Sequence, residues 1–150
     1  METVELSRLD DFAQKMLDML RSLEQKPQAT LVALRGDLGS GKTTFVQTLA
    51  KALGITETLQ SPTYVLMKSY NLPKNTTLPF TKLVHIDAYR LENPKQFAAL
   101  KPEQFLQDPK ALVCIEWPER VEGKLPKPDL FINFSSEGMK ESERGVEVEK

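Results

Sequence analysis

A short glycine-rich loop, GDLGSGKTT, holds the residues of this sequence best suited to chemistry. Gly36, Gly41, Lys42 and Thr43 follow the spacing GxxxxGK[ST]. Glycines let successive backbone N–H groups point inward, the following helix adds the positive end of its dipole, and lysine supplies a cation for the outer phosphate oxygens. The threonine hydroxyl can ligate magnesium. The loop is therefore predicted to hold nucleotide phosphates, and the alternative is an ordinary glycine turn before a helix.

Two acidic residues follow apolar runs that are typical of buried strands. Asp87 comes directly after KLVHI, and Glu116 comes directly after ALVCI. Parallel strands deliver such residues to the crevice at their carboxyl ends, where a ligand binds. Phosphoryl chemistry needs a carboxylate for magnesium and a group that aims the attacking water, so these two acids are candidates for both tasks. Each could instead be an exposed strand-end carboxylate or a helix cap.

Three further features are less specific. SPTYVL, residues 61–66, is a turn entering a strand, and its hydroxyl Thr63 could report the terminal phosphate as a nucleotide switch does. A simple capped turn is the alternative. The lone histidine, His85, is expected to point into the sheet or its edge. Trp117 is expected to pack or to contact a partner, since no basic stripe accompanies it.

The elements that must position these residues follow from hydrophobic periodicity. Apolar residues at helical spacing predict helices over residues 8–24 and 42–53, and a third from Asn93-Pro94 that is interrupted at Pro102. The runs ATLVALRG and ALVCIEW predict buried strands. TYVLMKSYN and TKLVHIDAYR predict two more, and PDLFINFS with RGVEVEK predicts an antiparallel hairpin. The expected fold is a single α/β domain, residues 1–150, with a mixed sheet and helices outside.

Composition excludes several classes of protein. The 150 residues carry 20 basic and 21 acidic side chains, so the net charge of -1 gives no overall attraction to nucleic acid or membranes. No apolar run approaches the roughly 20 residues of a membrane span, and METVELSRLDD is too polar for a signal peptide. One cysteine, Cys114, permits no intramolecular disulfide. A cytoplasmic location is expected.

Four ordered blocks, GDLGSGKTT, SPTYVL, HIDAYRL and IEWPER, together closely resemble the TsaE family of bacterial P-loop ATPases, also called YjeE. The resemblance covers residues 31–120 and implies a P-loop NTPase fold. It implies ATP or ADP and Mg²⁺ as ligands, with TsaB and TsaD as partners in making threonylcarbamoyladenosine (t6A) in tRNA. It also implies that the chain does not transfer the threonylcarbamoyl group itself but controls that pair through its ATPase cycle.

The family pattern also implies roles for individual residues. Thr43 and Glu116 would ligate magnesium, Asp87 would promote hydrolysis together with Lys42, and Thr63 would be the switch hydroxyl. Arg144 near the last strand, and Asp11 or Phe12 in the first helix, would contact the base. The remaining residues would hold the phosphates: Gly39, Ser40, Gly41, Lys42, Thr43 and Thr44.

Two other functions stay open at the level of sequence. A small-molecule P-loop kinase would use the same loop, but it usually needs an arginine-bearing lid, and only Arg90 and Arg120 are available as clamps. A nucleotide-gated scaffold would bind nucleotide with negligible hydrolysis. Direct contact with tRNA is not decided by the sequence.

Overall fold

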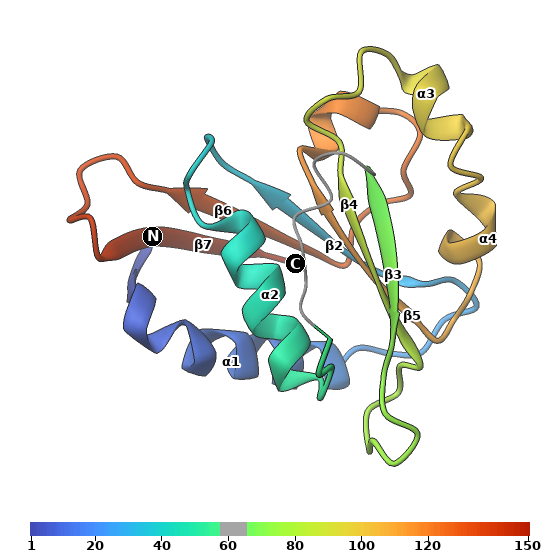
Figure 1. Ribbon diagram of the computed structural model, residues 1–150, viewed down its shortest axis with the longest axis horizontal. Coiled ribbons are helices and arrows are strands. Elements are labelled where there is room, and N and C mark those ends of the chain that lie inside the picture. Colours follow the sequence, from blue (N-terminus) through green and yellow to red (C-terminus); the bar gives the residue numbers. More distant parts are fainter. Residues whose placement is uncertain (58–65) are drawn as a thin grey trace.

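The protein is described by a computed structural model that covers residues 1–57 and 66–150. Its strands form one seven-stranded sheet in the order β1-β7-β6-β2-β5-β4-β3 (Figure 1). The strands are β1 (Glu2–Glu5), β2 (Thr30–Arg35), β3 (Met67–Asn71), β4 (Lys82–Asp87), β5 (Ala111–Glu116), β6 (Leu130–Ser135) and β7 (Glu143–Glu149).

The sheet is parallel in its centre and antiparallel at both edges. β2 pairs in parallel with β5 and β6, and β5 pairs in parallel with β4. β7 runs antiparallel to β6 and to β1, while β3 runs antiparallel to β4. The carboxyl ends of β2, β4 and β5 therefore meet at one edge of the sheet, where an α/β fold binds its ligand. The predicted mixed sheet and the predicted hairpin of the last two strands are confirmed.

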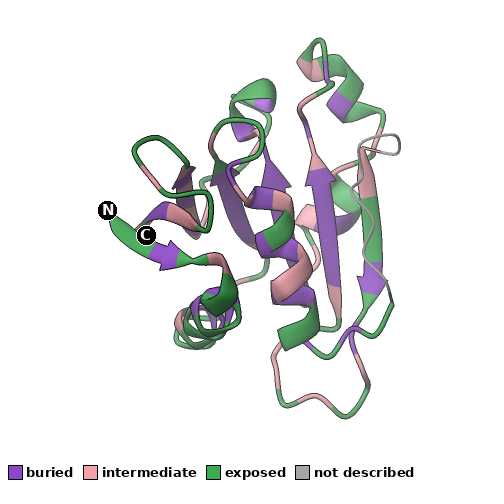
Figure 2. Cartoon of the chain, turned by 60° about the vertical axis from the view of Figure 1, so that its left-hand side comes forward, coloured by how far each residue is buried: buried purple, intermediate pink, exposed green. Residues whose placement is uncertain are grey.

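Helices cover both faces of this sheet. α1 (Leu9–Arg21) and α2 (Lys42–Ala52) pack on one face, and their apolar sides join one hydrophobic core. α3 (Pro94–Ala98), α4 (Glu103–Leu106) and the 3-10 turn η2 (Pro118–Val121) cover the second core on the other face. Figure 2 shows the buried residues concentrated on the central strands between these layers. No helix in residues 1–57 and 66–150 has the length and apolarity to cross a membrane.

The predicted elements are present with shifted ends. The first helix begins one residue later and ends three residues earlier than expected, at Leu9 and Arg21. Strand β1 and the 3-10 turn η1 (Leu6–Arg8) precede it and were not predicted. Asn93 caps α3 by accepting a hydrogen bond from the Lys95 N–H, as its Asn-Pro sequence indicates. Of the strand predicted in TYVLMKSYN, residues 63–65 lie outside the described residues.

The single cysteine lies in the centre of the sheet. Cys114 is on β5, between β2 and β4, and its side chain has no exposure to solvent. Burial raises the pKa of the Cys114 thiol to about 12. A thiol this buried and this weakly acidic is chemically inert, so its role is in packing.

Candidate nucleotide site

The glycine loop connects the carboxyl end of β2 to the start of α2, as its motif requires. Gly36 has φ 144° and Gly41, the residue before α2, has φ 106°, and both values favour glycine. A Cβ atom on Gly36 would lie 2.5 Å from the Phe134 carbonyl oxygen and 2.6 Å from Ser40 Oγ. The loop therefore reaches its shape only with glycine where β2 ends beside β6.

Lys42, the first residue of α2, turns its side chain back into the loop. Its Nζ donates hydrogen bonds to the backbone carbonyls of Gly36, at 2.5 Å, and Asp37, at 2.8 Å. Only 4% of this residue is exposed. Burial lowers the pKa of Lys42, an effect that the nearby carboxylates of Glu116 and Asp87 oppose. The Lys42 side chain is therefore a desolvated cation held by two backbone carbonyls of the loop.

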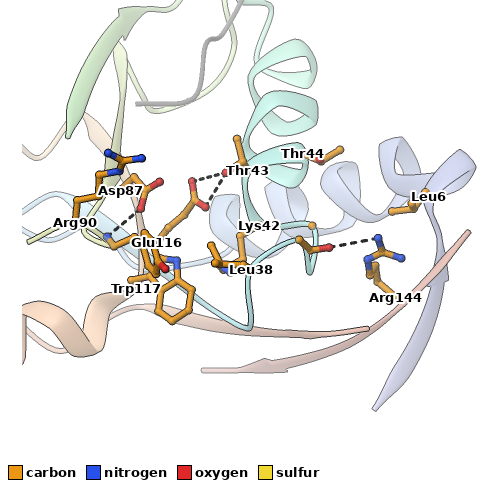
Figure 3. Close-up of a pocket in the computed structure, with 13 residues that line it drawn as sticks. Leu6, Leu38, Lys42, Thr43, Thr44, Asp87, Arg90, Glu116, Trp117 and Arg144 are labelled. Atoms are coloured by element: carbon orange, nitrogen blue, oxygen red, sulfur yellow. Dashed lines mark hydrogen bonds between the residues drawn. The ribbon is translucent and has the colours of Figure 1, made fainter. Parts of the chain in front are cut away.

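Thr43 and Glu116 meet across the space between α2 and β5. The Thr43 hydroxyl lies 2.8 Å from Glu116 Oε1 and 3.0 Å from Oε2, and it donates to this carboxylate. Glu116 is the last residue of β5 and is 2% exposed. The motif threonine and one predicted strand-end acid are thus brought into direct contact, as Figure 3 shows.

The second predicted acid lies beside the first. Asp87, the last residue of β4, is in register with Glu116 on β5. Its Oδ1 accepts a hydrogen bond from the Tyr89 N–H at 3.0 Å. Burial, and then the charge of Glu116, raise the pKa of Asp87, while the Tyr89 N–H lowers it. A carboxylate with a raised pKa is a better proton acceptor.

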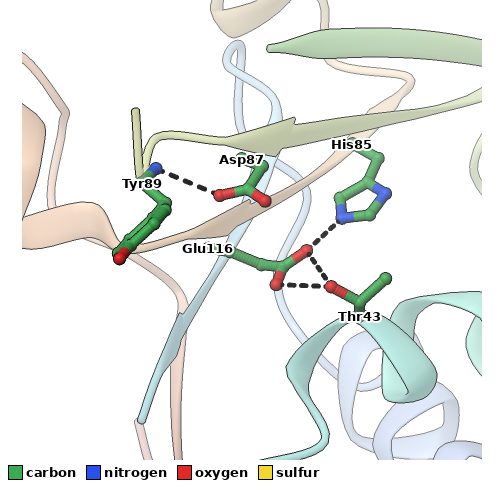
Figure 4. Close-up of polar contacts among 5 residues, drawn as sticks. All are labelled: Thr43, His85, Asp87, Tyr89 and Glu116. Carbon is green, nitrogen blue, oxygen red and sulfur yellow. Dashed lines mark hydrogen bonds and ion pairs between the residues drawn. The ribbon is translucent and has the colours of Figure 1, made fainter. Parts of the chain in front are cut away.

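His85 is a member of this cluster that sequence reasoning did not assign. It lies two residues before Asp87, so the two side chains share a face of β4. It is fully buried, and its Nε2 lies 2.6 Å from Glu116 Oε2 (Figure 4). The prediction that it points into the sheet is confirmed. Its partner could be identified only from the register of β4 and β5.

Lys42, Thr43, Asp87 and Glu116 line one cavity of about 460 Å³, whereas His85 lies outside its lining. The volume is in the range of small-molecule sites. Leu6 and Tyr89 belong to its wall and were not predicted as site residues, and Arg90, which also lines it, was considered only as a clamp for the kinase alternative. The full lining is Leu6, Leu38, Gly39, Gly41, Lys42, Thr43, Thr44, Asp87, Tyr89, Arg90, Glu116, Trp117 and Arg144.

Arg144 brings the end of the chain to this cavity. It lies on β7, opposite Val4 of β1, and its Nη2 donates to the Gly39 carbonyl at 3.3 Å. Its Nη1 donates to the carbonyls of Glu141 and Glu143. The guanidinium is therefore held against the glycine loop by its own hairpin.

Trp117 forms the wall next to Lys42. Its backbone has φ 60°, a strained conformation for a non-glycine residue. The ring lies 4.6 Å from the Lys42 ammonium and packs on Tyr89 with a centroid distance of 5.0 Å. Arg120 lies over the other ring of this pair, 5.5 Å from the Tyr89 centroid. The predicted packing role of Trp117 is thus confirmed, and the groups that it packs against, Lys42 and Tyr89, also line the cavity.

A model of the family described as "Threonylcarbamoyl adenosine biosynthesis protein TsaE" matches residues 5–146. The chain belongs to the TsaE family. This match includes the glycine loop, both strand-end acids and Arg144. The TsaE family takes part in t6A biosynthesis in tRNA, so the resemblance seen in the four sequence blocks is confirmed.

Several proteins named "tRNA threonylcarbamoyladenosine biosynthesis protein TsaE" are similar to the chain. The Synechocystis protein is 42% identical over 101 residues, which are 65% of this chain and 60% of that protein. The Bacillus subtilis protein is 34% identical over 129 residues, covering 86% of this chain and 75% of the relative. The match thus spans less than two thirds of the Synechocystis relative.

A solved structure is similar over nearly the whole chain. The crystal structure of Bacillus subtilis YdiB superimposes with a TM-score of 0.69 at 25% identity, covering 97% of this chain and 80% of that one. Together with the TsaE match and the glycine loop, this likeness confirms the predicted P-loop NTPase fold.

Four residues that the TsaE resemblance assigned do not line the cavity, or cannot be placed. Asp11 is exposed on α1, and its carboxylate accepts hydrogen bonds from Arg8 at 3.1 Å. Phe12 packs in the core against Phe45. Ser40, within the loop, is fully buried, and its Oγ accepts a hydrogen bond from the Lys42 Nζ at 3.3 Å. Thr63 lies outside the described residues. Base contacts by Asp11 or Phe12 therefore stand on the resemblance alone.

The donor set of the TsaE site fits magnesium. In residues 1–57 and 66–150 no group of three or more His, Cys, Asp or Glu side chains is arranged to hold a metal ion. Thr43 and Glu116 instead offer one hydroxyl and one carboxylate within hydrogen-bond distance. Magnesium bound with a nucleotide takes oxygen ligands, usually one or two from the protein and the rest from phosphates and water. The Thr43 hydroxyl and the Glu116 carboxylate therefore fit a magnesium ion that takes its other ligands from phosphate and water.

Proposed function

We propose that the chain binds ATP with Mg²⁺, hydrolyses it to ADP and phosphate, and controls the TsaB–TsaD pair in t6A modification of tRNA. The observation that carries this proposal is the single cavity in which the motif residues Lys42 and Thr43 face the strand-end acids Glu116 and Asp87. A glycine turn without a ligand would not need these four charged or polar groups at one edge of the sheet.

The phosphates would be bound by the loop and by Lys42. Gly41 precedes α2, so the unpaired N–H groups of the first helical turn face the loop, and anions bind well at such an end. Lys42 donates at present to two carbonyl oxygens of the loop. Phosphate oxygens are stronger acceptors for a charged donor, so the ammonium would move to them when a nucleotide enters.

Thr43 and Glu116 would hold the metal. Magnesium bound there would neutralise charge on the phosphate oxygens as the terminal phosphate leaves. The Thr43 hydroxyl now donates to Glu116, and it would turn its oxygen toward the ion while the carboxylate provides the negative charge.

Asp87 would act on the attacking water. It lies next to Glu116 in register, it lines the cavity, and burial raises its pKa. These properties suit a base that orients a water molecule and accepts its proton. Lys42 would stabilise charge on the phosphate at the same time.

The regulatory part of the proposal rests on the family and on simple energetics. The TsaE relatives are named for t6A biosynthesis. The terminal phosphate of ATP can change how a partner binds only through contacts that are present in the ATP-bound chain and absent in the ADP-bound chain. Hydrolysis would remove those contacts and so reset the TsaB–TsaD pair for another turnover, without transfer of the threonylcarbamoyl group by this chain. The switch role of Thr63 remains a prediction.

The test is phosphate release from ATP, measured alone and with purified TsaB and TsaD, alongside t6A formation on tRNA. Glu116→Ala and Asp87→Asn should lose partner-stimulated release, whereas Glu119→Ala, an exposed acid on η2, should keep it. Full release by either site variant would refute the role of that residue. Phosphate transfer to an added nucleoside would favour the small-molecule kinase, and binding without any release would favour the gated scaffold.

A further inference from the structure

His85 stands apart from the other polar residues of the interior. Among the described residues, four polar or charged side chains are buried: Ser40, Lys42, His85 and Glu116. Three belong to the loop motif or to the proposed metal site. Only His85 has no role in the function proposed above, although an apolar residue would fill a central strand at lower desolvation cost.

The fold places His85 beside the metal-binding carboxylate. Side chains alternate along a strand, so His85 and Asp87 share one face of β4, and Cys114 and Glu116 share the same face of β5. On each strand this face is apolar near its start and polar at its carboxyl end. His85 is paired with Cys114, two residues before Glu116, so it lies farther from the carboxyl end of the sheet than Glu116 does. Its Nε2 still lies 2.6 Å from Glu116 Oε2 (Figure 4).

The Glu116 carboxylate therefore has hydrogen-bond partners on two neighbouring elements. Thr43 reaches it from α2, and His85 reaches it from β4. An ionised carboxylate can only accept, so His85 Nε2 carries the hydrogen of this bond. The Thr43 hydroxyl is itself a proposed metal ligand and would leave Glu116 when the ion binds. His85 would then be the protein donor that still fixes the carboxylate, whose terminal torsion is otherwise soft.

We infer that His85 is a positioning residue, which orients the Glu116 carboxylate for magnesium through the Nε2 hydrogen bond and does not touch the nucleotide. This inference deepens the proposed function and rests on it. Partners of this kind, behind a metal ligand, commonly change metal affinity by about 10- to 100-fold when they are removed. The phosphate loop does not contact His85 through any described hydrogen bond, so nucleotide binding without metal should not depend on it.

The experiment is calorimetric titration of the full chain with ADP, once in Mg²⁺ and once in EDTA, and the readout is the ratio of the two affinities. His85→Leu removes the donor but keeps an apolar group of similar size. We expect its ratio to fall about tenfold, with the affinity in EDTA within about twofold of the original. His85→Gln, which keeps an N–H near the Nε2 position, should restore most of the ratio.

A matched control separates positioning from stability. Leu83 is buried on the same face of β4, two residues from His85, and has no contact with Glu116 among the hydrogen bonds described. Leu83→Ala should lower the free energy of unfolding and leave the ratio unchanged. An unchanged ratio in His85→Leu would overturn the inference, as would an equal loss in His85→Gln or in Leu83→Ala.

Three outcomes separate a failure of the His85 role from a failure of folding or of the magnesium site. If His85→Leu does not fold, His85→Gln is compared with His85→Asn, whose shorter amide does not reach Glu116, and equal ratios would overturn the inference. If the unaltered chain binds ADP equally in Mg²⁺ and EDTA, the proposed magnesium site fails and the inference fails with it. An unaltered chain with a high ratio that His85→Leu retains would refute the role of His85 alone.

Discussion

Lys42 gives the most direct test of the site at the scale of one residue. Its ammonium is buried and is satisfied by loop carbonyls, so its removal takes away the one side-chain cation that the motif directs at phosphate. Lys42→Ala should weaken ATP binding by roughly 100-fold, because charge-assisted hydrogen bonds contribute about 1.5–3 kcal/mol each. Calorimetric titration measures this loss. Lys51→Ala, an exposed change in the last turn of the same helix, is the control, and unchanged affinity in Lys42→Ala would contradict the phosphate role.

Asp87 should make the fold less stable as pH rises. Its pKa is raised above the ordinary 3.8, so the folded state binds its proton more tightly than the unfolded chain does. Its contribution to stability is complete below the ordinary pKa and is lost as pH rises through the raised value. Asp87→Asn, which does not titrate, should therefore gain stability relative to the original chain as pH rises from the ordinary pKa of 3.8 through the raised value. Urea unfolding without nucleotide or metal measures the difference.

Asp108 offers a control with the opposite sign. The Lys110 N–H and then Lys82 lower its pKa. Its contribution is present above the ordinary pKa and is lost as pH falls, so Asp108→Asn should cost stability near neutral pH and lose that effect in acid. If Asp87→Asn follows the trend of Asp108→Asn, the buried environment assigned to Asp87 is wrong.

Residue types and spacing were enough to find four polar groups that line the cavity, but not the buried histidine that contacts one of them. Lys42 and Thr43 stand in a motif, and Asp87 and Glu116 each end an apolar run, so their positions follow from local sequence. The His85–Glu116 pair joins residues 31 positions apart and depends on which strands are neighbours and in what register. No local pattern encodes that information.

At the scale of elements, the strand-loop-helix unit depends on Gly36. Any side chain there meets the β6 backbone, which is part of the sheet and cannot move aside. Gly36→Ala should cost about 2–4 kcal/mol of stability and abolish nucleotide binding, because the clash adds to the strain of φ 144°. Gly123→Ala is the matched control, since Gly123 has φ 82° but an added Cβ there would meet no atom within 4 Å, and it should cost only about 1–2 kcal/mol. Equal losses in urea unfolding would contradict the steric argument.

Elements with strong periodicity were predictable, and β1 shows why others were not. α1 and α2 carry long apolar stripes, and β2 and β5 are continuous apolar runs. β1 has four residues, of which only Val4 is buried, and it exists because β7 offers it an edge to pair with. Leu6, which follows β1, lines the cavity because the pairing of β1 with β7 places it there. Tertiary pairing, rather than local preference, decides such segments.

At the scale of the whole molecule, the cavity joins both ends of the chain. Leu6 and Arg144 line one part of it, while Asp87 and Trp117 line another. A ligand bound there contacts segments that unfolding would separate, and it should stabilise the entire fold. With Mg²⁺ and ADP at about 100 times the dissociation constant, the free energy of unfolding should rise by about 2.7 kcal/mol. Urea unfolding with and without ligand measures this rise, and an unchanged midpoint would refute binding at this site.

Replacing Arg144 tests whether the hairpin of β6 and β7 contributes to ligand binding. Arg144→Ala removes the donor to the Gly39 carbonyl without touching Lys42 or Glu116. Arg144 also lines the cavity, and the TsaE resemblance assigns it to the base, so the loss of one hydrogen bond to the nucleotide should shrink the stabilisation by Mg²⁺ and ADP at a fixed concentration by about 1 kcal/mol. Lys140→Ala, an exposed change in the same hairpin region, should leave it intact.

The buried thiol of Cys114 leaves the molecule without a natural attachment point for sulfhydryl reagents. A cysteine introduced at Leu38, at the exposed tip of the phosphate loop, would be the single reactive one on an otherwise unaltered background. A fluorophore, spin label or crosslinker could then be placed at the mouth of the cavity in one step, and the approach of a second protein could be followed there in real time.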